Sequence, residues 1–153
     1  MPIEKSAGAV IFKTNKETEY LLLHYPSSAK APRDYWDFPK GHIEKGEKLE
    51  ETIKREVKEK TGIKNIKLVE NFKETIKYFF RHEGKNVLKF VTFFLAETKI
   101  EEVKISQEHI GYKWLSYPEA LNFLTFNNAK EILKKANDFL RQAQDKSLSE
   151  KSI

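Results

Sequence analysis

The sequence contains no cysteine, which excludes disulfide bonds and thiolate metal sites. Any metal ion must therefore be held by oxygen or nitrogen ligands. No apolar run approaches the length of a membrane-spanning helix, and the first residues lack the basic start and long apolar centre of a signal peptide. We therefore expect a cytoplasmic protein with no membrane partner.

The sequence also lacks a block of like charges, an internal repeat and a recognisable linker. Lys and Arg number 28 against 23 Asp and Glu, a net charge of +5 that favours anionic partners such as nucleotides, nucleic acid or polyphosphates. A soluble surface that is only incidentally basic is the alternative. The mixed signs do not favour a nucleic-acid-binding tail. We expect one monomeric domain over residues 1–143 and a flexible C-terminal tail over 144–153.

The pattern of apolar residues predicts an α/β domain with mixed strands and few helices. Residues 26–41 carry three prolines and many small or polar residues, which is typical of a loop. Short apolar runs that are typical of strands occupy residues 5–13, 19–25, 66–81, 87–97 and 112–115.

Two segments have a helical pattern. Leu49, Ile53 and Val57 recur every four residues and give one apolar stripe, so we predict a helix over 48–61. Gly62 follows directly and is a plausible C-terminal stop. A second helix is predicted to begin near residue 127, where asparagine side chains can cap it.

The most informative region is the segment 38–63, in which a loop runs into a helix dense in carboxylates. Glu56 and Glu59 lie about 60° apart around the helix axis, close enough to share a divalent cation. Arg55 can hold carboxylates in place by charge-assisted hydrogen bonds. Gly41 lets a phosphate or a metal approach the main chain. Taken alone, these residues are more typical of a solvated helix with salt bridges than of a metal site.

The spacing of these residues changes that interpretation. Gly41, Glu47 and the run from Arg55 to Ile63 match the pattern G-x5-E-x7-REUxEExGU, in which U is apolar, and the chain therefore resembles the Nudix family. The resemblance implies an α/β/α sandwich with a mixed central β-sheet, and a hydrolase for a nucleoside diphosphate linked to another group. Lys60 departs from the pattern, because the family has a glutamate there that is commonly a metal ligand. The number of ions held is therefore open.

The resemblance also implies roles for the residues of the pattern. Glu56 and Glu59 would be ligands of Mg²⁺ or Mn²⁺, with a contribution from the carbonyl of Gly41. Glu47 would pair structurally with Arg55. Such a site fits the chemistry, because attack of water on a polyphosphate needs its negative charge neutralised.

The flanking segments WDFPKGH, residues 36–42, and SQEHIGYKWLSYPEAL, residues 106–121, resemble the asymmetrical diadenosine tetraphosphate hydrolases of animal and archaeal type. That resemblance implies that Lys40 meets the phosphate chain and that His42 assists at or near the reacting phosphorus. Glu108 would complete the metal site or act as the general base. A surface acid, for Glu108, and a loop hydrogen bond, for His42, are the simpler alternatives.

The same resemblance implies that Tyr78 and Phe126 stack the adenine and that Lys89 contacts phosphate. Core packing of the two rings and an outward-facing lysine are the alternatives. The leading hypothesis is metal-dependent hydrolysis of diadenosine tetraphosphate, a small-molecule nucleotide substrate, to ATP and AMP. The alternatives are pyrophosphate removal from an RNA end, hydrolysis of another nucleoside polyphosphate, and a non-catalytic nucleotide-binding module. Lys60 motivates the last of these.

Overall fold

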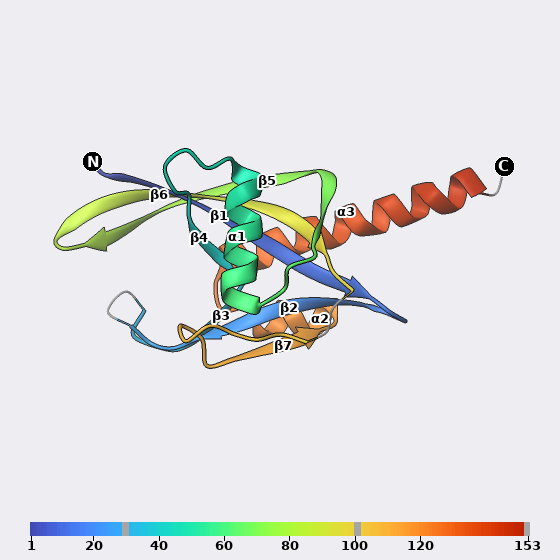
Figure 1. The fold of residues 1–153 in the computed structure, drawn as a ribbon, viewed down its shortest axis with the longest axis horizontal. Coiled ribbons are helices and arrows are strands. Elements are labelled where there is room, and N and C mark those ends of the chain that lie inside the picture. Colours follow the sequence, from blue (N-terminus) through green and yellow to red (C-terminus); the bar gives the residue numbers. More distant parts are fainter. Residues whose placement is uncertain (29–30, 100–101, 152–153) are drawn as a thin grey trace.

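The computed structural model describes residues 1–28, 31–99 and 102–151. Figure 1 shows the elements that these residues form. The strands are β1 (Ile3–Thr14), β2 (Thr18–Tyr25), β3 (Tyr35–Asp37), β4 (Lys40–His42), β5 (Lys67–His82), β6 (Lys85–Glu97) and β7 (Gly111–Leu115). The helices are α1 (Leu49–Thr61), α2 (Tyr117–Phe123) and α3 (Asn127–Lys151).

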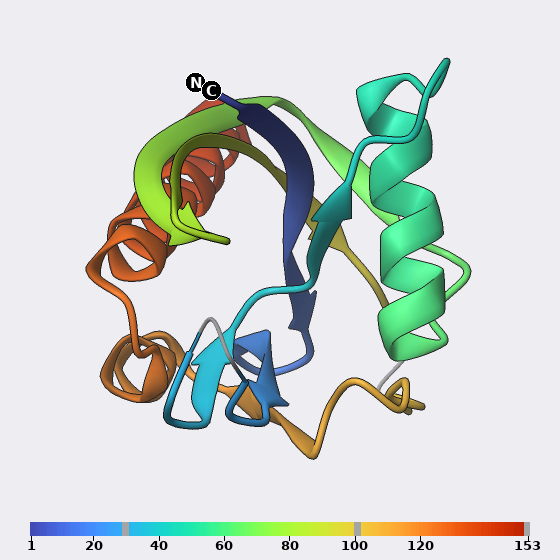
Figure 2. The ribbon, with the colours of Figure 1, turned by 90° about the vertical axis from the view of Figure 1, so that its left-hand side faces the viewer.

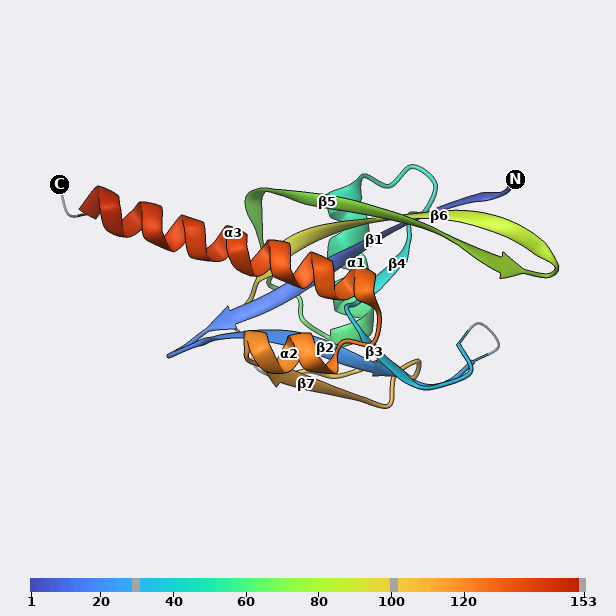
Figure 3. The same cartoon turned by 180° about the vertical axis from the view of Figure 1, so that it is seen from behind.

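The strands form one mixed sheet in the order β3-β2-β1-β6-β5, with β4 paired to β1 and β7 paired to β2. Strand β1 is parallel to β6 and antiparallel to both β2 and β4. Helix α1 covers one face of the sheet, and α2 and α3 cover the other (Figures 2 and 3). The predicted α/β/α sandwich with a mixed central sheet is confirmed.

Two apolar cores fill the spaces between these layers. Because successive side chains of a strand point to opposite faces, β1 supplies both cores. Ala9 and Ile11 pack with Ile53 and Val57 of α1, whereas Val10 packs on the side of α2 and α3. All five are at most 1% exposed. This alternation fixes which side chains of the sheet face α1 and which face α3.

Helix α1 forms where the four-residue apolar stripe predicts it. It begins at Leu49, and Ile53 and Val57 are buried on the stripe. Gly62 ends the helix in the left-handed conformation, with φ 74°. Its N–H donates to the carbonyl of Lys58 at 2.9 Å, which satisfies one of the last helical carbonyls.

The expected loop over 26–41 is wrong in part, because it contains β3 and ends in β4. Each of these strands has only three residues, so neither has a periodicity that sequence alone could detect. They are extended because β2 and β1 offer them hydrogen-bond partners. Helix α2 was not predicted either, since its seven residues make fewer than two full turns.

The C-terminal segment is more regular than expected. Helix α3 continues to Lys151, so most of the expected tail over 144–153 is helical, and residues 152 and 153 lie outside the described residues. The flexibility of this segment and the division of the chain at residue 143 stay predictions. In the part of the chain that the structure describes, no helix is both long and apolar enough to span a membrane.

Candidate active site

The Nudix-like pattern folds into a compact unit made by β4 and the adjoining helix α1. Gly41, in the middle of β4, lies directly against the carboxyl group of Glu56. A Cβ atom at Gly41 would come closer than 3.0 Å to all three atoms of that carboxyl group. The missing side chain is therefore what allows a carboxylate of α1 to rest on the main chain of β4.

Arg55 organises the carboxylates around it. It donates two hydrogen bonds to Glu47, from Nε at 2.7 Å and from Nη2 at 2.9 Å, in the two-pronged geometry that favours Arg–carboxylate pairs. Its Nη1 donates to Glu56 Oε1 at 2.7 Å and to Glu59 Oε2 at 3.3 Å. Its Nη2 also donates to the carbonyl of His42 at 3.0 Å. One guanidinium thus connects the loop, β4 and the helix.

These bonds keep both partners charged. The pKa of Glu47 is lowered to about 2. The main cause is the hydrogen bond from Arg55, and the next is the hydrogen bond from the backbone N–H of Glu44. The hydrogen bond to Glu47 raises the pKa of Arg55 above its already high usual value. The pair therefore remains ionised over the whole range in which proteins work, and it holds the guanidinium in place for Glu56.

Glu56 is a buried carboxylate with unused bonding capacity. The residue is 6% exposed, and its Oε2 has no hydrogen-bond partner. Glu59 lies one helical turn further on, with its side chain largely exposed. Carboxylate oxygens of this kind suit hard dications such as Mg²⁺. Among the described residues, no group of three or more His, Asp or Glu side chains is arranged to hold a metal ion.

Lys60, at the position where the Nudix-like pattern has a glutamate, lies beside these carboxylates. Its Nζ donates to Glu108 Oε2 at 2.7 Å and lies 3.5 Å from Glu56 Oε2. The structure thus brings Glu108 to the helix although 48 residues separate it from Lys60 in the chain. The hydrogen bond from Lys60 lowers the pKa of Glu108, which keeps this carboxylate ionised.

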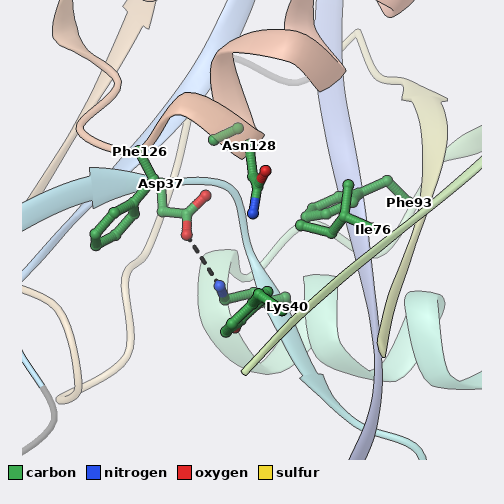
Figure 4. A pocket seen from close by; sticks show the side chains of 8 residues that line it. Asp37, Lys40, Ile76, Phe93, Phe126 and Asn128 are labelled. Atoms are coloured by element: carbon green, nitrogen blue, oxygen red, sulfur yellow. Dashed lines mark hydrogen bonds and ion pairs between the residues drawn. The ribbon is translucent and has the colours of Figure 1, made fainter. Parts of the chain in front are cut away.

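A cavity of about 260 Å³ lies on the other side of β4. Three residues to which the resemblance gives a role in substrate binding, Lys40, Tyr78 and Phe126, line it together. Figure 4 shows Lys40 and Phe126 in the wall. Apolar side chains form much of the remaining wall. The full lining consists of Asp37, Lys40, Ile76, Tyr78, Phe93, Phe126, Asn128 and Ala129.

The cavity combines apolar walls with one ion pair. Lys40 Nζ donates to Asp37 Oδ2 at 3.0 Å (Figure 4), and Asp37 is only 2% exposed. Burial by itself would lower the pKa of Lys40, but the neighbouring Asp37 carboxylate outweighs it, and the pKa is raised. Burial raises the pKa of Tyr78, so its hydroxyl stays neutral. Lys40 therefore presents a permanent positive charge beside an aromatic surface.

The cavity and the carboxylates lie on opposite faces of the same short strand. Lys40 and Gly41 are successive residues of β4, so they face opposite sides. Lys40 faces the cavity beneath the start of α3, and Gly41 faces Glu56 on α1. Strand β4 pairs with β1 on one edge, and its other edge has no strand partner in the described residues. A ligand that crosses this edge can contact both faces.

Two of the predicted site residues lie apart from these groups. The side chain of His42 is exposed, and only the main-chain carbonyl of this residue accepts a hydrogen bond from Arg55. Lys89 does not line the cavity; it lies on β6 directly opposite Tyr78 of β5 and is partly buried. The proposed roles of His42 and Lys89 therefore stay predictions.

Sequence reasoning missed two polar residues of the cavity. Asp37 stands three residues before Lys40, and a buried acid at this distance from a lysine could have indicated their pairing. The sequence indicates Asn128 only as a possible helix cap, whereas its side chain points into the cavity (Figure 4). No local pattern distinguishes these two roles of an asparagine at a helix start.

Comparisons with known proteins agree with this geometry. The family model of the NUDIX domain matches residues 4–136. An asymmetrical bis(5'-nucleosyl)-tetraphosphatase of Mus musculus is 33% identical over 89% of this chain and 95% of its own length. An RNA pyrophosphohydrolase of Nitratiruptor is 26% identical over 90% and 92%, respectively. Among solved structures, the protein chain in the crystal structure of a C. elegans Ap4A hydrolase binary complex is similar in fold, with a TM-score of 0.76. Its sequence is 30% identical, and the match covers 91% of this chain and 98% of the C. elegans chain.

The family model covers most of the chain. Within that range, the Nudix-like pattern folds around the Glu47–Arg55 pair and the contact of Gly41 with Glu56. The chain therefore belongs to the Nudix family of hydrolases.

Proposed function

We propose that this protein hydrolyses dinucleoside polyphosphates and cleaves diadenosine tetraphosphate to ATP and AMP by attack of water on phosphorus. The observation that carries the proposal is that successive residues of β4 belong to two different sites. Lys40 belongs to an aromatic cavity, and the next residue, Gly41, lies against the Glu56 carboxylate. One strand thus joins a nucleoside pocket to a carboxylate site. The similarity to bis(5'-nucleosyl)-tetraphosphatases supports the choice of substrate.

The cavity is suited to one nucleoside of the substrate. Its volume of about 260 Å³ is at the small end for ligand pockets, so it leaves the phosphate chain outside. Tyr78 and Phe126 offer rings on which a base can stack, at about 1–3 kcal/mol per base. Asp37 and Asn128 supply the polar groups that a purine edge can contact. The second nucleoside lies beyond the carboxylates in this proposal.

The phosphate chain then runs from Lys40 over the unpaired edge of β4 towards α1. The Lys40 ammonium binds the chain near the nucleoside, with Asp37 holding it in position. His42 is exposed at the end of the same strand, where we propose that it acts close to the reacting phosphorus. Lys89, opposite Tyr78 in the sheet, is proposed to contact a phosphate oxygen.

Nudix hydrolases generally depend on a divalent metal, and the residues present fit one. Glu56 has a buried oxygen without a hydrogen-bond partner, and Glu59 offers a second carboxylate on the same face of α1. Together with the carbonyl of Gly41, they would hold Mg²⁺ or Mn²⁺. When bound, such an ion neutralises phosphate charge and acidifies a water molecule. Arg55 would fix the ligands, and Glu108, kept ionised by Lys60, would complete the metal site or accept a proton.

Chromatography of the products from diadenosine tetraphosphate, with pure protein and Mg²⁺, tests this proposal. We expect equal amounts of ATP and AMP, and Glu56→Gln should abolish their formation. Two molecules of ADP, or no turnover by the wild-type protein, would exclude this reaction. No turnover of any nucleotide despite tight binding would favour a non-catalytic module instead.

A second candidate is removal of pyrophosphate from an RNA end. The similarity to an RNA pyrophosphohydrolase and the net charge of +5 favour it. Binding to long RNA should then weaken steeply with added salt, because many phosphates are neutralised in the complex. An affinity for long RNA no better than for a mononucleotide counts against this candidate.

We further propose that the protein is a monomer and that it is cytoplasmic. Sedimentation analysis can test the first proposal, and cell fractionation can test the second.

A further inference from the structure

Lys60 is the residue at which this chain departs from the Nudix pattern, and its surroundings are unusual for a lysine. Its side chain is only 12% exposed at the end of α1. The ammonium is 2.7 Å from Glu108 Oε2 and 3.5 Å from Glu56 Oε2. Glu56 Oε2 is buried and has no hydrogen-bond partner. One positive charge therefore stands between two carboxylates that come from different parts of the chain.

Two carboxylates that face each other need a cation between them, because like charges in a partly buried site destabilise the ionised forms. In a metal site that cation is a hard dication, which carboxylate oxygens bind directly. A lysine ammonium is a compact point charge with three donors, so it can also bridge two carboxylates. The ammonium carries one positive charge and is attached permanently to the helix.

We propose that the Lys60 ammonium serves as a built-in cation between Glu56 and Glu108 and takes the place of one divalent metal ion there. Any ion that remains would be held by Glu56, Glu59 and the carbonyl of Gly41, as proposed above. This inference rests on the metal-dependent chemistry of the proposed function but is independent of the substrate. It predicts a smaller metal complement than the same fold would hold with a glutamate at position 60.

Counting bound Mn²⁺ by electron paramagnetic resonance, without any substrate, tests the proposal. Lys60→Glu restores the carboxylate and should bind one more Mn²⁺ per chain than the wild-type protein. Lys58→Glu is the matched control: it makes the same change of charge two residues earlier, on an exposed position of the opposite helix face. It should bind the same number of ions as wild type. Equal stoichiometry in Lys60→Glu and wild type would overturn the proposal.

A second variant removes the ammonium without adding a ligand. In a chelator, Lys60→Gln should unfold at a lower temperature than Lys58→Gln, because no cation then bridges Glu56 and Glu108. Mg²⁺ should restore most of this loss in Lys60→Gln and should change Lys58→Gln little. An equal response of the two variants to Mg²⁺ would refute the role of Lys60. Because both measurements omit nucleotides, a failure here leaves the proposed hydrolysis untouched, and a failure to cleave the substrate leaves these results valid.

Discussion

Replacement of Gly41 by alanine should damage the site more than the same replacement at any other glycine of the chain. The new Cβ would come closer than 3.0 Å to Cδ, Oε1 and Oε2 of Glu56. The carboxylate therefore has to move, because a shift of β4 instead would disrupt the pairing of β4 with β1. Moving it breaks the 2.7 Å hydrogen bond from Arg55 and displaces a proposed metal ligand.

Two magnitudes follow from this overlap. A misplacement of a catalytic group by about 1 Å costs on the order of 100-fold in rate, so we expect kcat to fall about 100-fold. Overpacking a well-filled site costs about 1–3 kcal/mol, so the free energy of unfolding should fall by that amount. Initial rates of ATP and AMP formation in Mg²⁺ measure the first effect, and urea denaturation measures the second.

The chain provides both a control and a way to locate the cause. Gly111→Ala makes the same change on β7, where the nearest atom to the added Cβ, in His24, is 3.7 Å away, an ordinary contact. That variant should stay within about twofold of the wild-type rate. In a Glu56→Ala background, Gly41→Ala should cost less than about 0.5 kcal/mol, because the atoms that it meets are gone.

The reasoning would be refuted by a Gly41→Ala protein that retains its full rate. It would also fail if Gly41→Ala destabilised the Glu56→Ala background as much as it does the wild-type protein. In the second case the cost arises from the backbone of β4 and not from the contact with the Glu56 carboxylate.

Three further predictions concern the pocket, the metal ligands and pH. Tyr78→Leu should raise KM for the dinucleotide about tenfold by removing a stacking ring, whereas Phe79→Leu, 64% exposed on the same strand, should leave KM unchanged in steady-state assays. Glu59→Gln should raise the Mg²⁺ concentration for half-maximal rate at least about tenfold, with no change in melting temperature, since its side chain is largely exposed. Burial lowers the pKa of His109 from 6.5 to about 4, so the unfolded state binds its proton first. The free energy of unfolding should therefore fall as pH drops from about 6.5 to about 4. Urea titrations across this range should show a smaller fall in His109→Gln. An unchanged pH dependence in that variant would contradict the assignment to His109.

Much of the architecture could be predicted because it depends on local patterns. The stripe of Leu49, Ile53 and Val57 places α1 within one residue of its observed start, and Gly62 ends it by adopting a conformation that other residues avoid. Short apolar runs likewise predict β1, β2, β5, β6 and β7. Strands β3 and β4 could not be predicted, because three extended residues acquire a preference only when a neighbouring strand pairs with them.

The candidate site divides in the same way. The spacing of Gly41, Glu47 and Arg55 predicts a unit that holds carboxylates, since those residues are close in the chain and Arg55 lies on the same helix as the two acids. The Lys40–Asp37 pair and the place of Asn128 were missed, because burial and helix docking decide them. The sequence alone also leaves open whether Lys60 lies near Glu108, 48 residues away.

By itself, then, the sequence determines the family, the helix that carries the carboxylates and the one position that departs from the pattern. These features depend on residues of one continuous segment, 41–63, for which spacing along the chain largely fixes spacing in space. Only the tertiary structure decides that Lys60 bridges Glu56 and Glu108, and that the cavity and the carboxylates lie on opposite faces of β4. Both arrangements depend on contacts between distant segments, which the packing of the layers brings together.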